Sequence, residues 1–239
     1  MEDILINVQD FIHAFKEAFT EAAELPLAFW YDDTPVAATP KLPGCMFKVI
    51  DQARRGEPVA FSADNIGCGG GRFYTGFSGR SPHIAQFVSL KEKYKQTPEM
   101  VTAHIDDLDV QLADKPYLNF LRIDKLETFD KMEGLLFFAR PDVLCGLTAW
   151  AFYDNNDGGA VTTPWSAGCG SVITMAVGEN RRGGQRTFIG LTDISVRPFV
   201  APDELGFTIP RSRFLTMQHT LGQCCLFGAP AWQKVKERL

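Results

Sequence analysis

A cysteine flanked by two glycines occurs twice in this chain of 239 residues, as Gly67-Cys68-Gly69 and as Gly168-Cys169-Gly170. A second cysteine precedes each of them at nearly the same distance: Cys45 lies 23 positions before Cys68, and Cys145 lies 24 positions before Cys169. Both intervening segments contain a helix-like apolar run, a glycine, a short extended run and a polar turn. We therefore predict an internally duplicated strand–helix–strand unit that ends in a Gly-Cys-Gly loop, with the two loops close together about a pseudo-twofold axis.

Strand-like segments alternate along the chain with segments whose apolar residues have helical spacing. The expected helices are 4–23, 45–55, 83–95, 97–108, 142–153, 211–221 and 231–239. The expected strands are 27–31, 58–61, 117–123, 134–139, 160–163, 187–192 and 206–209. Segments 72–77 and 172–177 fit either a helix or an extended conformation. The alternation predicts a layered sandwich of the α/β or α+β class.

No low-complexity linker divides the chain, so we expect one domain over residues 1–239. It would contain two pseudo-repeats, at about 26–112 and 117–210, followed by the C-terminal helices. The length is sufficient for a packed core.

The charge and hydropathy patterns argue against several classes of protein. The formal net charge is −5 and no long basic run is present, which argues against non-specific binding of nucleic acid. No window approaches the roughly 18 apolar residues of a membrane span. The first ten residues lack the basic start of a secretory signal. The six cysteines are therefore expected to be thiols in a reducing cytoplasm.

The first Gly-Cys-Gly loop predicts a ligand site, because four glycines in the stretch 67–71 let a backbone approach a ligand closely. Arg72 would add donors for a phosphate or carboxylate. The alternative is a tight turn needed only for packing. In the segment 190–198, Asp193, Ser195 and Arg197 would share one face of an extended chain, or form a solvated edge with an Asp–Arg pair. The complete predicted ligand-binding set is Cys68, Gly69, Gly70, Gly71, Arg72, Cys169, Gly170, Ser171, Asp193 and Arg197.

The cysteines allow further interpretations. A thiol at a helix N-terminus is activated as a nucleophile, which makes Cys68 a candidate catalytic residue. Of the histidines that could assist it (His13, His83, His104 and His219), we favour His83. A four-thiolate set for zinc or an iron–sulfur cluster would consist of Cys45, Cys68, Cys145 and Cys169. The simplest alternative for each cysteine is a small buried apolar side chain. Aromatic residues near the loops form either a pocket wall or core: Phe73, Tyr74, Trp150 and Trp165.

The combination of motifs resembles the uncharacterised family known as domain of unknown function 169. The motifs of the first half are Pro43-Gly44-Cys45, Ala53-Arg54-Arg55-Gly56, Cys68-Gly69-Gly70-Gly71 and Gly76-Phe77. Those of the second half are Phe138 to Leu144, Gly168 to Ser171, Asp193 to Pro198 and Phe207 to Pro210. The resemblance covers nearly the whole chain and implies no activity or cofactor.

The leading functional hypothesis is a cytoplasmic protein that binds a small anionic or cofactor-like ligand between the two Gly-Cys-Gly loops. The alternatives are a thiol-dependent enzyme that uses Cys68 and a protein with a cysteine-ligated metal or cluster. The sequence leaves open whether the protein is an enzyme, and it predicts no particular cofactor or oligomeric state.

Overall fold

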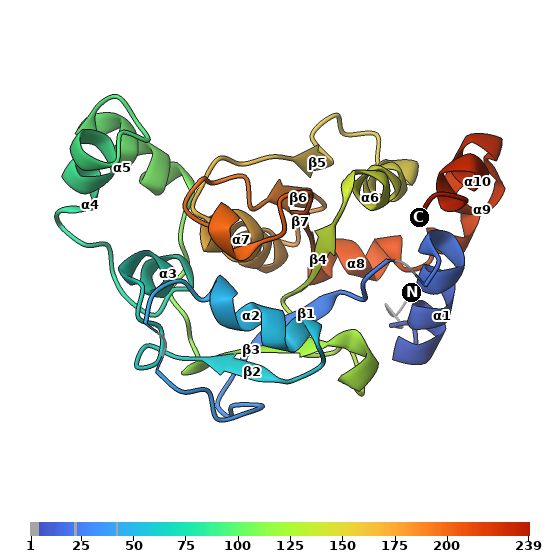
Figure 1. Cartoon of the computed structure of the whole chain (residues 1–239), viewed down its shortest axis with the longest axis horizontal. Helices are drawn as coiled ribbons and strands as arrows, with labels where there is room; N and C mark the ends of the chain where they lie inside the picture. Colours follow the sequence, from blue (N-terminus) through green and yellow to red (C-terminus); the bar gives the residue numbers. More distant parts are fainter. Residues whose placement is uncertain (1–4, 22, 42) are drawn as a thin grey trace.

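The computed structural model describes residues 5–21, 23–41 and 43–239. The described residues form a seven-stranded sheet with the order β2-β3-β1-β4-β7-β6-β5 (Figure 1). Neighbouring strands are antiparallel except for the parallel pair β5–β6 at one edge. The strands are β1 (Leu27–Asp32), β2 (Val59–Phe61), β3 (Tyr117–Arg122), β4 (Gly134–Ala139), β5 (Val161–Thr162), β6 (Thr187–Gly190) and β7 (Leu205–Pro210).

Helices cover both faces of the sheet. Face A carries α1 (Val8–Phe19), α6 (Pro141–Tyr153), α8 (Arg211–Met217), α9 (Cys225–Gly228) and α10 (Pro230–Lys236). Face B carries α2 (Phe47–Arg54), the π-helical turn η3 (Gly170–Thr174) and α7 (Met175–Arg181). The remaining helices and helical turns are α3 (Gly69–Tyr74), α4 (Ile84–Gln86), η1 (Phe87–Lys91), α5 (Pro98–Asp107), η2 (Ile123–Lys125), η4 (Arg197–Phe199) and η5 (Leu221–Gln223). This mixed helix–sheet–helix arrangement confirms the predicted layered class.

The alternation of side chains along a strand explains why both faces need cover. In the central strand β4, Leu135 and Phe137 point into the core on face A, whereas Leu136 and Phe138 point into the core on face B. All six residues of this strand are buried. A strand that is apolar on both sides is stable only between two layers, and the helices supply them.

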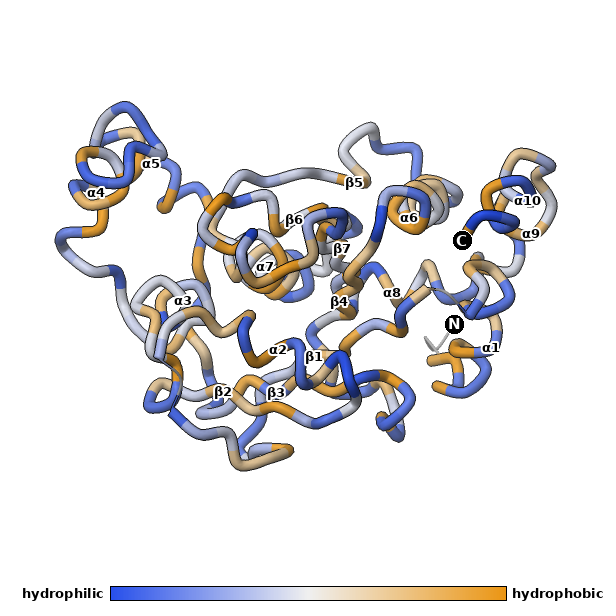
Figure 2. The backbone as a smooth tube through the Cα atoms, in the orientation of Figure 1, coloured by the Kyte–Doolittle hydropathy of each residue, from blue (hydrophilic) through white to orange (hydrophobic). Residues whose placement is uncertain are grey.

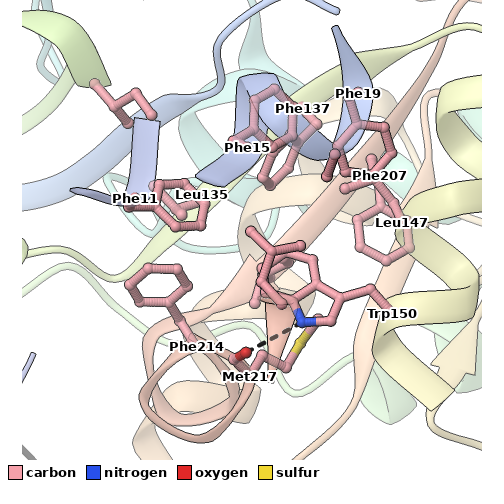
Figure 3. Close-up of a cluster of buried hydrophobic side chains, with 14 of the residues drawn as sticks. Phe11, Phe15, Phe19, Leu135, Phe137, Leu147, Trp150, Phe207, Phe214 and Met217 are labelled. Carbon is pink, nitrogen blue, oxygen red and sulfur yellow. Dashed lines mark hydrogen bonds between the residues drawn. The ribbon is translucent and has the colours of Figure 1, made fainter. Parts of the chain in front are cut away.

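The core on face A is dominated by aromatic rings from distant segments (Figure 3). The ring of Phe11 meets that of Phe214 edge-on, with centroids 5.1 Å apart. Trp150 is fully buried, and its indole Nε1 donates a hydrogen bond to the carbonyl of Met217 at 3.1 Å. A buried indole needs such a partner, so this bond fixes the position of α8 against α6.

The predicted duplication is not evident in the arrangement of the helices. The segment that follows Cys45 becomes α2 on face B, whereas the segment that contains Cys145 becomes α6 on face A. The two segments read alike in sequence but are packed on opposite sides of the sheet. The pseudo-repeats therefore stay a prediction.

A helical excursion over residues 84–108, here called the cap, stands at one end of the molecule. It contains α4, η1 and α5, and Figure 1 shows α4 and α5 at the opposite end from α9 and α10. Hydrophobic and hydrophilic stretches are mixed within it (Figure 2). Thr97 begins α5 as expected, because its side chain accepts the backbone N–H of Met100 at 3.3 Å and Pro98 follows it.

None of the helices formed by the described residues combines the length and the apolar character needed to cross a lipid bilayer.

A buried carboxylate on α7 gives a pH-dependent contribution to stability. The Glu179 side chain is only 4% exposed and accepts hydrogen bonds from Arg186 Nη2 at 2.7 Å and from Arg182 Nη2 at 3.3 Å. Burial alone would raise the pKa of Glu179, but hydrogen bonds from Arg186 outweigh it and lower that pKa below 4.5. The contribution to stability is therefore complete above about pH 4.5 and is lost as the pH falls through the lower folded-state value.

We expect Glu179→Gln to lower the free energy of unfolding by about 1–3 kcal/mol at pH 7, because charge-assisted hydrogen bonds are replaced by neutral ones. The difference between the two proteins should shrink as the pH falls below about 4.5, the usual value for glutamate. Urea unfolding at a series of pH values measures it. A difference that grows on acidification would contradict this assignment.

Candidate functional site

A cavity of about 280 Å³ lies where the two Gly-Cys-Gly loops meet the cap. The loops contribute Cys68, Gly70, Gly71, Gly168 and Cys169 to its wall. The start of α2 and the segment after β6 line the side of the cavity that belongs to the sheet and its helices, here called the body, and the cap lines the opposite side. Most of the wall is apolar; its apolar and aromatic members include Met46, Phe47, Tyr74, Phe87, Val101, Ile105, Trp165 and Val196. The two predicted loops thus share one cavity, of a size that suits a small molecule.

The first loop exposes a sulfur to the cavity. Cys68 is the residue before α3, and its Sγ accepts the backbone N–H of Gly71 at 3.4 Å. Gly71 is needed for this turn, since a Cβ there would stand 3.0 Å from Cγ2 of Ile66. A Cβ on Gly70 would meet only the Cys68 Sγ, at 3.8 Å, and one on Gly69 would meet nothing within 4 Å. Gly70 lines the cavity, whereas Gly69 is exposed outside it.

The second loop is packed more tightly. Ser171 Oγ donates to the carbonyl of Gly168 at 3.0 Å and accepts the N–H of Leu191 at 3.1 Å, which joins the loop to the end of β6. A Cβ on Gly170 would lie 2.1 Å from Ser166 Oγ. Both Gly170 and Ser171 are buried, and they serve packing rather than the cavity wall. Of the predicted residues in this loop, Cys169 lines the cavity.

One π-helical turn contributes to the cavity wall and a second begins next to it; such turns are rare and occur frequently at functional sites. One is η3, which follows Cys169 directly, and the other is η1 in the cap, which contributes Phe87 and Val88 to the wall.

Three thiols from separate segments line the cavity: Cys45, Cys68 and Cys169. Burial, followed by the charge of Cys68, raises the pKa of the Cys169 thiol strongly. Burial also raises the pKa of the Cys45 thiol. The thiols of Cys45 and Cys169 are therefore neutral at pH 7.

The predicted four-thiolate metal site does not form. Cys145 is exposed on α6, on the opposite face of the sheet from the other three cysteines, and borders a separate shallow groove. Among the described residues, no three cysteine, histidine, aspartate or glutamate side chains converge as a metal site requires. The sheet lies between Cys145 and the other three cysteines, so the similar spacing of the cysteines in the sequence does not bring all four together.

The two predicted arginines lie outside the cavity wall. Arg72 is exposed on α3. Arg197 donates instead to the carbonyls of Leu191 at 3.2 Å and Glu204 at 2.6 Å, and it also reaches those of Ala201 and Pro202. Arg197 therefore ties the connection between β6 and β7 together. The geometry does not support the predicted role of either arginine in binding an anion.

Trp165, in the loop before Cys169, joins the body of the protein to the cap. Three cap side chains contact its ring: Lys95 Nζ lies 4.6 Å from the ring centroid, the His104 ring centroid lies at 5.3 Å and the Tyr94 ring centroid at 5.9 Å. The cation–π and aromatic contacts hold the cap over the cavity. Of the four aromatic residues expected near the loops, Trp165 and Tyr74 line the cavity, whereas Trp150 belongs to the core on face A.

The histidine beside the cavity is His104 rather than the predicted His83. Burial, followed by the nearby charge of Lys95, lowers the pKa of His104, so its imidazole is neutral at pH 7. Its Nε2 is buried, with no hydrogen-bond partner among the described residues. His83 is exposed at the start of α4 and lies outside the cavity wall.

Two carboxylates complete the site. Asp193 lines the cavity and is only 5% exposed, and Glu92 of the cap stands exposed at the mouth. Asp193 Oδ1 accepts the backbone N–H of Ser195 at 3.2 Å, and Oδ2 accepts the Ser195 hydroxyl. Asp193 was among the residues predicted from the sequence, whereas the cap residues Glu92, Tyr94 and Lys95 were not. The sequence feature that could have identified these three is the close spacing of charged and aromatic residues over 92–95.

The comparisons with known proteins identify a family and nothing finer. No curated protein and no solved structure matches the chain. A family model matches residues 14–219, which is most of the chain, and the family is described as uncharacterised ArCR. This agrees with the resemblance noted in the sequence motifs, and the chain belongs to the family called domain of unknown function 169.

Proposed function

We propose that this protein binds a small, largely apolar molecule in the cavity between the two Gly-Cys-Gly loops and the cap. The observation that carries the proposal is the cavity itself, about 280 Å³ with both loops in its wall. Small-molecule sites are mainly apolar concavities with a few polar groups, and this wall has that composition. The anionic ligand expected from the sequence is not favoured, because the charged cavity-lining residues are Glu92, Lys95 and Asp193 and neither predicted arginine is among them.

The site offers a substitution that should close the cavity, together with a matched control. Gly70→Leu would place a branched side chain where Gly70 lines the wall. Gly69→Leu would place the same side chain one residue away on the outside of the same helix, where there is open space. Both replace a helical glycine with a good helix former, so their effects on helix stability are similar.

The experiment measures the fluorescence of 1-aminoanthracene, a neutral apolar probe, on titration with the protein. We expect saturable binding to the unsubstituted protein. Gly70→Leu should raise the Kd at least about tenfold, because the added side chain occupies ligand volume, and Gly69→Leu should leave it unchanged. Equal binding to all three proteins would place the probe elsewhere and would contradict the proposed site. Thermal unfolding confirms that both variants are folded.

A second candidate function is thiol chemistry at Cys68. Its support is that the Cys68 sulfur is half-buried in the wall of the cavity and accepts the N–H of Gly71. Backbone N–H groups at the start of a helix stabilise a thiolate, the nucleophilic form of cysteine. Cys45 and Cys169 share the cavity but are held neutral by burial. The reactivity of these thiols towards an alkylating agent tests this candidate.

A further inference from the structure

The charged residues that line the cavity indicate which chemical class of ligand it would bind, provided that the proposed binding function holds. The starting point is Asp193, whose side chain is 95% removed from solvent in a mainly apolar wall. A buried carboxylate is costly unless a cation or several hydrogen bonds compensate it. Among the described residues, the hydrogen bonds to the Asp193 carboxylate come from a single neighbour, Ser195. Within the described parts of the chain, no lysine, arginine or histidine forms an ion pair with Asp193.

The lysine that lines the cavity forms a contact with an aromatic ring. Lys95 lines the cavity, but its ammonium lies over the Trp165 ring at 4.6 Å from the centroid. His104 also lines the cavity and is neutral. The carboxylates in the lining are Asp193 in the wall and Glu92 at the mouth, so together with Lys95 the formal net charge of the cavity lining is −1.

The field of Asp193 reaches groups across the cavity. Burial, followed by the Asp193 carboxylate, raises the pKa of Glu92 and of Tyr94, both of which belong to the cap. The same carboxylate acts on Tyr74 on the body side, although burial and Cys169 contribute more there. A carboxylate that forms no ion pair within the described residues therefore lies in one wall and acts on both sides of the cavity.

We propose that the ligand is an organic cation, with an apolar body against the aromatic wall and a protonated amine or similar head group beside the buried carboxylate of Asp193. Glu92 at the mouth would attract the same head group from the cap side, so that the ligand links cap and body. Trp165 and Tyr94 supply aromatic surface suited to the body of such a ligand. A metal ion is not favoured, because hard cations take six or more oxygen ligands and the described residues bring no such set together.

Three probes with a similar aromatic body and different charges test whether the site prefers a cation. Phenethylammonium is a cation, 2-phenylethanol is neutral and phenylacetate is an anion, and each is titrated against bound 1-aminoanthracene. We expect phenethylammonium to bind about tenfold more tightly than 2-phenylethanol, which is near the lower limit of the coupling expected for a close charge pair, and phenylacetate to bind most weakly. Asp193→Asn should remove this preference and change the affinity for 2-phenylethanol less than about threefold.

Ser195→Ala is the matched control for Asp193→Asn. It removes the hydroxyl that donates to Asp193 but keeps the carboxylate, so it should retain the preference for the cation. Glu92→Gln should weaken phenethylammonium binding about two- to threefold, because Glu92 is exposed.

The outcomes separate the two proposals. Equal affinity for all three probes, or tightest binding of phenylacetate, would overturn the cation proposal while leaving a ligand site. Failure of all three to displace bound 1-aminoanthracene would overturn it as well. If 1-aminoanthracene itself does not bind, the proposed function fails and the cation proposal fails with it. A cation preference that Ser195→Ala abolishes would assign the effect to the loop and not to the charge.

Discussion

Iodoacetamide is expected to alkylate Cys169 at least about a hundredfold more slowly than Cys68 at pH 8, although both sulfurs line the same cavity. The physical cause is the strongly raised pKa of Cys169, which leaves little thiolate to react. A more basic thiolate is a better nucleophile. On a logarithmic scale, however, this gain in reactivity offsets less than half of the rate that is lost because the thiolate fraction is smaller. Peptide mass spectrometry after timed quenching gives both rates in one experiment.

The pH dependence provides an internal check on the Cys169 rate. Because the pKa of Cys169 is raised far above the working range, its alkylation rate should keep increasing about tenfold per pH unit up to pH 10. Cys145, exposed on α6, shows that the reagent is active. A Cys169 rate equal to that of Cys68, or one that reaches a plateau below pH 10, would contradict the neutral thiol. Slowing of the Cys68 reaction by bound 1-aminoanthracene would place the probe beside Cys68 in the proposed cavity.

Removal of the Trp150 side chain should be among the most destabilising single changes to the core on face A. Trp150 is fully buried, its ring centroid lies 6.3 Å from that of Phe11, and its indole holds the Met217 carbonyl. We expect Trp150→Ala to lower the free energy of unfolding by about 3–5 kcal/mol, because a large cavity remains and the Met217 carbonyl loses one of its hydrogen bonds.

Phe152→Ala is the matched control for this prediction, because Phe152 lies two residues further along the same helix and is 39% exposed. The expected loss there is below about 1 kcal/mol. Urea unfolding followed by circular dichroism measures both values. Similar losses for the two variants would mean that the packing of α6 on face A is not as described.

The sequence predicted elements well where local signals were complete. Helix α5 has a capping threonine and a proline at its first position, and β4 has an unbroken apolar run, so both were found within a residue or two. The segments 72–77 and 172–177 were ambiguous because glycines and β-branched residues fit several conformations. They became the end of α3 and a π-helical turn leading into α7. The expected helix over 83–95 ended earlier, at Lys91.

The site was predicted in part, for a physical reason. Five residues of the predicted ligand-binding set line the cavity, because glycine loops and strand ends are recognisable locally: Cys68, Gly70, Gly71, Cys169 and Asp193. Their role in binding stays a prediction. The prediction that the arginines line the site was wrong. A guanidinium beside a loop can donate hydrogen bonds to backbone carbonyls as readily as to a ligand, and Arg197 donates to carbonyls. The cap residues could not be predicted from local sequence, because only the tertiary packing brings them next to the two Gly-Cys-Gly loops.

The position of the cap in the chain has a consequence for how binding preference can diversify. Strands β2 and β3 are antiparallel neighbours in the sheet, yet α3 and the whole cap are inserted between them in the chain. Such an insertion can be lengthened, shortened or exchanged while the two strands keep their pairing. The part of the cavity wall that the cap supplies can thus change in length and sequence while the sheet stays the same. Under the proposed function, the preference for a ligand would change with the cap and not with the scaffold.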